Sequence, residues 1–117
     1  MLQAAHAAMY FWKMVGTQSN YAHAAQLLAH VYALLKLPGP AAKYLSRSSP
    51  HFMQQGCTAG ELAFAHAVAA NVASAQGNAA AYEKHYSAAK TAATRITDPR
   101  TRELFAVTLR VVPIPSE

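Results

Sequence analysis

Residues 58–78, TAGELAFAHAVAANVASAQGN, contain one helix together with its start and stop signals. Thr58 and Glu61 form the Thr-x-x-Glu pattern of a capping box, in which both side chains satisfy free backbone amides at a helix start. Gly77 accepts the left-handed backbone conformation in which many helices end. Apolar residues recur at helical spacing between these signals, so the stretch predicts a helix. They are Leu62, Ala65, Val68, Ala69 and Val72.

Two further helices are predicted downstream by signals of the same kind. Asn78 can cap a helix whose apolar face extends to Ile96. Asp98 followed by Pro99 predicts the next helix start, because aspartate caps free amides and proline fits the first helical turn. Prolines then interrupt residues 113–117, which we expect to form a loose tail.

Three helices are predicted upstream. The first covers residues 2–16, where apolar side chains recur at alternating steps of three and four. The second ends at the Pro-Gly-Pro sequence of residues 38–40, where the third begins. We expect the third helix to end near Ser48, because Pro50 cannot donate a backbone hydrogen bond. Residues 49–57 would then be the longest connection.

The length and composition predict a single all-α domain over residues 1–112. A chain of 117 residues is long enough for one core without disulfide or metal support. Apolar residues make up 53% of it, and many of them are alanine, which favours helix and close helix packing. Charged residues are 13%, about half of what a typical soluble domain carries. We therefore expect an apolar outer face, and with it a homodimer or other homo-oligomer.

The net charge of +5 is unevenly distributed, since residues 1–60 contain no acid. This basic half can attract an acidic partner or nucleic acid. We do not expect nucleic-acid binding, because the later bases are dispersed. No segment has the roughly 20 apolar residues of a membrane span, and the start lacks signal-peptide features, so we expect a cytoplasmic protein without membrane partners. The dispersed bases are Lys84, Lys90, Arg95, Arg100 and Arg102.

The segment 22–53 resembles a tetratricopeptide repeat (TPR), and a weaker second copy follows it. The first copy has Leu28, Ala29, Tyr32, Ala41 and Leu45 at the signature positions. The second has Ala69, Ala70, Ala73, Tyr82, Tyr86 and Ala89. Leu28 and Ala69 are 41 residues apart, whereas the usual repeat has a period of about 34. The chain can also be a piece of a longer repeat array.

This resemblance implies a TPR-like right-handed superhelix of antiparallel helix pairs and a non-enzymatic module that binds a protein or peptide. It specifies a class of repeat and not a ligand. If the resemblance holds, one set of side chains faces a concave partner-binding groove. These residues are His23, Gln26, His30, Leu34, Phe64, Asn71 and Ser74.

Residue chemistry gives little support for catalysis, and we expect no catalytic residues, metal or cofactor. The six histidines are never three or four residues apart, the spacing at which two ligands share a helix face. Cys57 and His51 lie in one connection without an orienting acid. The alternative is a small-molecule-binding protein or an enzyme with a cavity between helices, in which histidines serve as acid or base groups. Its aromatic lining would be Tyr10, Trp12, Tyr32, Tyr82 and Tyr86.

Overall fold

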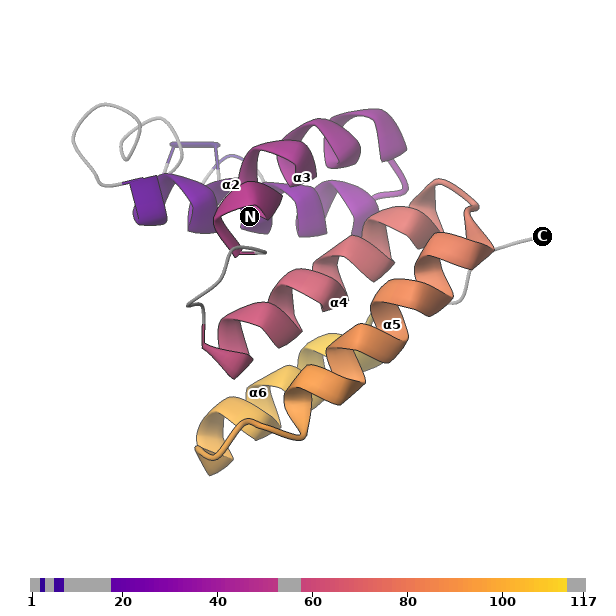
Figure 1. The fold of residues 1–117 in the computed structure, drawn as a ribbon. Coiled ribbons are helices and arrows are strands. Elements are labelled where there is room, and N and C mark those ends of the chain that lie inside the picture. Colours follow the sequence, from indigo (N-terminus) through magenta and orange to yellow (C-terminus); the bar gives the residue numbers. More distant parts are fainter. Residues whose placement is uncertain (1–2, 4–5, 8–17, 53–57, 114–117) are drawn as a thin grey trace.

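The computed structural model describes residues 3, 6–7, 18–52 and 58–113, and these residues form helices and short connections without a strand (Figure 1). The all-α expectation is confirmed for this part of the chain. The helix expected over residues 2–16 lies mostly outside the described residues, although Gln3, His6 and Ala7 are helical. The tail beyond residue 113 also lies outside them. The helices are α2 (Gln18–Leu34), α3 (Pro38–Phe52), α4 (Ala59–Ala75), α5 (Ala79–Ala93) and α6 (Pro99–Arg110).

The five helices are arranged as two antiparallel pairs and one further helix. α2 packs along α3, and α4 packs along α5. α4 also contacts α2, α3 and α6, so it lies at the centre of the arrangement (Figure 1). α6 rests mainly on α4 rather than on α5, its neighbour in sequence.

The helix starts follow the signals in the sequence. The backbone amide of Glu61 donates to the Thr58 hydroxyl at 3.1 Å, and the Glu61 carboxylate accepts from the Thr58 amide at 3.2 Å. This is the capping box at the start of α4. Asn78 caps α5 and Asp98 caps α6, each through a side-chain oxygen that accepts a first-turn amide. The predicted starts of α4, α5 and α6 are therefore confirmed.

The predicted end of α3 near Ser48 is wrong, because the helix continues through Pro50 to Phe52. Proline leaves one carbonyl of the preceding turn without its helical partner, but only near the end of the helix. Phe52 is 1% exposed and packs on Ala22 and Ala65. Burying a phenylalanine side chain stabilises the fold by about 1.5–3 kcal/mol, which offsets the proline penalty. Packing against α2 and α4 therefore decides where α3 ends.

Small side chains form most of the core around α4. Alanine occupies buried positions on several sides of this helix, and Val68, Val72 and Asn71 are the larger buried side chains between them. Such a surface lets neighbouring helices approach closely. The buried residues of α4 are Ala63, Ala65, Ala67, Val68, Ala69, Ala70, Asn71, Val72, Ala73 and Ser74.

Two helices end in the same backbone motif but with different residues at the left-handed position. After α4, Gly77 has φ 71°, and the amides of Gly77 and Asn78 donate back to the last turn. After α2, the same two hydrogen bonds come from Lys36 and Leu37. Lys36 has φ 60°, a conformation in which its Cβ crowds the backbone. The lysine therefore carries a strain that glycine would not.

Replacing Lys36 with glycine should stabilise the protein. A non-glycine residue in the left-handed conformation costs about 1–2 kcal/mol, which glycine avoids. The greater conformational entropy of glycine in the unfolded chain offsets roughly half of this gain. We expect Lys36→Gly to raise the free energy of unfolding by about 0.5–1 kcal/mol in urea titrations. Lys36→Ala keeps the Cβ atom and should give no comparable gain. Equal stabilisation by both variants would contradict the strain.

Candidate functional site

Two of the seven residues expected to line a concave groove contact each other. Asn71 on α4 donates from Nδ2 to Nδ1 of His30 on α2 at 3.0 Å and to the His30 carbonyl at 3.3 Å. Asn71 is fully buried, and its Oδ1 atom has no hydrogen-bond partner among the described residues. An amide nitrogen can only donate, so Nδ1 of His30 must be unprotonated. Burial accordingly lowers the pKa of His30. These two residues are therefore part of the contact between α2 and α4.

The other five residues of that expected groove lie in separate surroundings. His23 is exposed and meets Phe52 edge-on, with ring centroids 4.8 Å apart. Phe64 packs edge-on against Phe105 of α6 at 5.8 Å. Ser74 is buried and lines a hollow beside Gly77 at the end of α4. Of the remaining two, Gln26 is half-buried and Leu34 is exposed.

A second histidine contact connects α4 and α5. Nδ1 of His66 lies 3.0 Å from Nδ1 of His85, so one ring donates to the other. Burial lowers the pKa of both histidines, and the positive charge of Lys84 lowers both further. Protonation of both rings would place two donors opposite each other. The pair is thus stable only while at least one ring is neutral.

The histidines with described contacts reach across helix boundaries. His6 lies 2.7 Å from the hydroxyl of Tyr32 through Nε2, and His23 on α2 faces His51 on α3 with centroids 6.4 Å apart. Together with the two contacts above, these interactions connect neighbouring helices. Among the described residues, no group of three or more histidine, cysteine or acidic side chains is placed to hold a metal ion.

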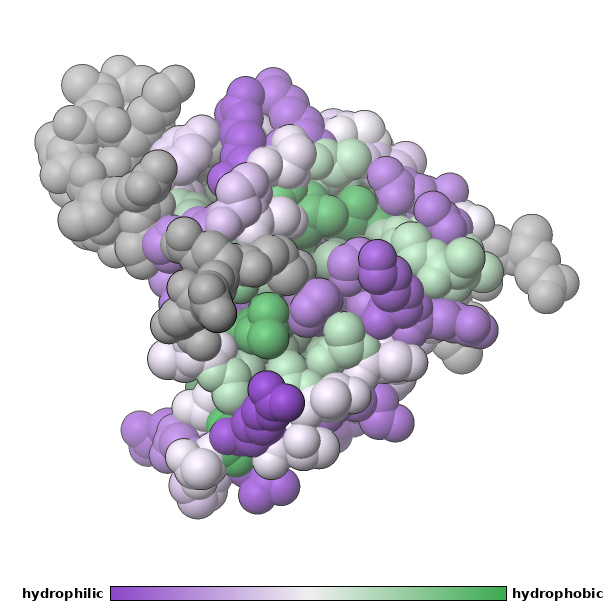
Figure 2. Space-filling view, viewed as in Figure 1, coloured by the Kyte–Doolittle hydropathy of each residue, from purple (hydrophilic) through white to green (hydrophobic). Residues whose placement is uncertain are grey.

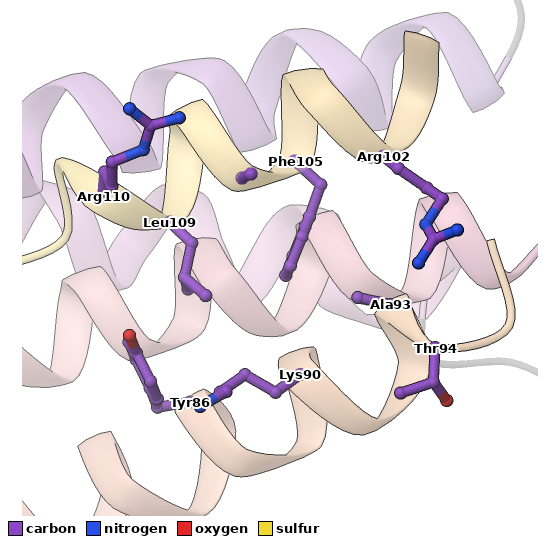
Figure 3. Close-up of a pocket in the computed structure, with 9 residues that line it drawn as sticks. Tyr86, Lys90, Ala93, Thr94, Arg102, Phe105, Leu109 and Arg110 are labelled. Carbon is purple, nitrogen blue, oxygen red and sulfur yellow. The ribbon is translucent and has the colours of Figure 1, made fainter. Parts of the chain in front are cut away.

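A groove of about 430 Å³ separates α5 from α6. Figure 3 shows Phe105 and Leu109 extending from α6 toward α5, with Tyr86 on the opposite wall. Phe105 is buried and Leu109 half-buried, so they form an apolar floor. The lining residues are Tyr86, Lys90, Ala93 and Thr94 of the α5 side and Arg102, Phe105, Ala106, Leu109 and Arg110 of α6.

All charged residues that line this groove are basic. Lys90 lies on the α5 wall, with Nζ 5.8 Å from the centre of the Tyr86 ring. Arg102 lies on the α6 wall, at the end where Thr94 ends α5 (Figure 3). Arg110 extends from α6 away from α5. The groove therefore combines an apolar floor with a positive rim, and no carboxylate lines it.

A second apolar surface lies on the outer side of α6. Leu104 and Val107 of α6 and Val111, which caps the end of this helix, are 57%, 51% and 50% exposed, and their spacing places them on one helical stripe. We call these three residues the α6 outer stripe. Elsewhere, Figure 2 shows apolar surface between the two helix pairs and hydrophilic side chains at the margins. Exposed leucines at and after the end of α2 add to the apolar surface, namely Leu34, Leu35 and Leu37.

Sequence reasoning missed both the His66–His85 contact and the α5–α6 groove. Both depend on which helices are neighbours, which spacing along one helix does not reveal. A local signal for the groove was nevertheless present. Tyr86 and Lys90 share one face of α5, while Arg102, Phe105 and Leu109 recur at helical spacing on α6. Pairing these two faces required the tertiary structure.

No protein-family model matches this chain, and no curated protein or solved structure matches it either. The described residues define an all-α domain of two helix pairs and one further helix. Within them, no helix is long and apolar enough to cross a membrane. The TPR resemblance and the cytoplasmic location therefore stay predictions.

Stability should fall as the pH drops through the histidine range. His30, His66 and His85 have pKa values below their ordinary 6.5, so the unfolded chain binds protons more readily than the folded chain. Their contribution is complete above pH 6.5 and declines below it. We expect the melting temperature to fall between about pH 7.5 and 5.5, before carboxylates titrate.

Lys84→Gln should reduce this pH dependence, because it removes a positive charge that disfavours protonation of His66 and His85. Lys90→Gln, on the same helix, is the matched control and should leave the pH dependence unchanged. A melting temperature that stays level over this pH range would contradict the role of the half-buried histidines His30, His66 and His85.

Proposed function

We propose that this chain is a non-enzymatic, TPR-like interaction module that associates with a second copy of itself through the α6 outer stripe. The order of packing supports a repeat origin: α2 pairs with α3, α4 pairs with α5, and the first helix of the second pair contacts both helices of the first. The observation that carries the proposal is the exposure of Leu104, Val107 and Val111 on one side of α6. Covering these side chains removes apolar surface from water, which favours association.

The charges beside the stripe support a second copy as the partner. Glu103 and Arg110 are seven residues apart and therefore lie on the same side of α6, next to the stripe. Both are exposed, and Arg110 extends away from α5 (Figure 3). In an antiparallel pair of α6 helices centred on Val107, each Glu103 approaches the Arg110 of the other copy. A two-fold interface of this kind is self-complementary in both shape and charge.

The alternative of a cavity lined by histidine and tyrosine has less support. Tyr32 stacks on Tyr44 at 5.7 Å, within the pairing of α2 and α3. Tyr82 and Tyr86 are neighbours on α5, with centroids 5.3 Å apart. Because α4 lies between α2 and α5, these aromatic groups belong to different parts of the fold. Tyr10 and Trp12 lie outside the described residues.

Sedimentation velocity or light scattering tests the self-association. We expect a concentration-dependent dimer for the unaltered chain. Val107→Glu should shift it to a monomer, since it places two buried charges opposite each other at the centre of the stripe. Ser87→Glu adds the same charge at an exposed position of α5 and should leave the dimer intact. A monomer at all concentrations, or equal effects of both variants, would overturn the proposal.

A charge exchange tests the antiparallel arrangement. Glu103→Arg should weaken the dimer by roughly two- to fivefold at low salt, because it opposes like charges across the interface. Adding Arg110→Glu to the same chain restores opposite charges and should recover the dimer. If the double variant is no better than the single variant, Glu103 does not face Arg110 across the two-fold axis.

A further inference from the structure

The α5–α6 groove borders a helix that rests mainly on α4, while Phe105 and Leu109 of α6 share an apolar cluster with alanines of α5. Phe105 anchors α6 by packing against Phe64 of α4, which holds the helix on the far side of the groove from α5. Leu109 and Tyr86 face the space that remains, and its volume is about 430 Å³. This volume is within the range of roughly 300–1,000 Å³ that is common for ligand sites.

The rim of the groove favours a negatively charged ligand. Lys90 and Arg102 project from opposite walls, and no acidic residue lines the groove to neutralise them. Both are exposed, so they are available to a ligand. We infer that the α5–α6 groove binds an acidic amphipathic helix of a partner protein. The apolar side of that helix covers Leu109 and Tyr86, and its carboxylates meet Lys90 and Arg102.

The length of the groove matches a short helix. On α5 the lining extends from Tyr86 to Thr94, and on α6 from Arg102 to Arg110. Each of these segments has a length of about 12 Å, or slightly more than two helical turns. The two walls are antiparallel, because Tyr86 and Arg110 lie at one end of the groove and Thr94 and Arg102 at the other (Figure 3). A helix laid into such a groove places apolar residues three and four apart on the floor and acidic residues at the rim.

This site shares only Arg110 with the proposed self-association surface. The groove uses the side of α6 that carries Arg102, Phe105 and Leu109, with Arg110 at one end. The α6 outer stripe, with Val107 at its centre, lies on the other side of the same helix. The Val107→Glu variant should therefore bind the peptide as the unaltered chain does, even where it no longer dimerises.

A pair of synthetic peptides tests the inference. The first is a fluorescein-labelled helical peptide of about 14 residues, with leucines on one face and glutamates on the other, which spans the groove. The second has lysine in place of every glutamate. Fluorescence anisotropy with the full chain at low salt should show that the acidic peptide binds at least about tenfold more tightly than the basic one. Raising the salt to about 0.3 M should weaken this binding.

Charge reversals locate the binding site. Lys90→Glu together with Arg102→Glu should reduce the affinity for the acidic peptide by about tenfold or more. The control is Lys84→Glu with Arg100→Glu, which also changes one exposed base on α5 and one on α6 but lies outside the groove. This control variant has the same net charge as the groove variant, and its affinity for the acidic peptide should fall by less than about threefold. Equal losses in both double variants, or equal binding of the two peptides, would overturn the inference.

Discussion

The fold depends on the close packing of helices around α4, which is buried on nearly every side. Its buried positions are occupied by alanine with few larger residues. Small side chains allow four other helices to contact this one helix, but each contact buries little apolar area. Larger residues from the neighbouring helices, such as Phe52 and Phe105, fill the remaining space. The positions of α3 and α6 therefore follow from where their phenylalanines meet the alanine surface.

Alanine surfaces are nearly uniform, so they do not by themselves fix how one helix is placed along another. Polar contacts across the helix boundaries supply such restraints. Asn71 hydrogen-bonds to His30 between α2 and α4, and His66 to His85 between α4 and α5. A buried polar group costs free energy when it loses its partner, so shifted arrangements are disfavoured. The same burial makes these contacts sensitive to protonation, because a charged ring loses solvation inside the fold.

The sequence was most informative where structure depends on a few adjacent residues. The capping residues Thr58, Asn78 and Asp98 predicted three helix starts, because each side chain bonds to an amide within its own first turn. The end of α3 was predicted wrongly, because burial of Phe52 against two other helices outweighs the effect of Pro50. The candidate site was harder still. The α5–α6 groove depends on α6 packing mainly on α4, and no pattern within α6 alone predicts which helix it packs on.

α6 shows how both proposed surfaces arise from one helix. Phe105 packs one side of α6 against α4. Because this contact is narrow, it cannot bury the whole circumference of the helix. α6 keeps Leu104, Val107 and Val111 exposed, while Leu109 borders the groove beside Arg102. Apolar side chains on two sides of one exposed helix, each bordered by charge, favour an interacting role for α6.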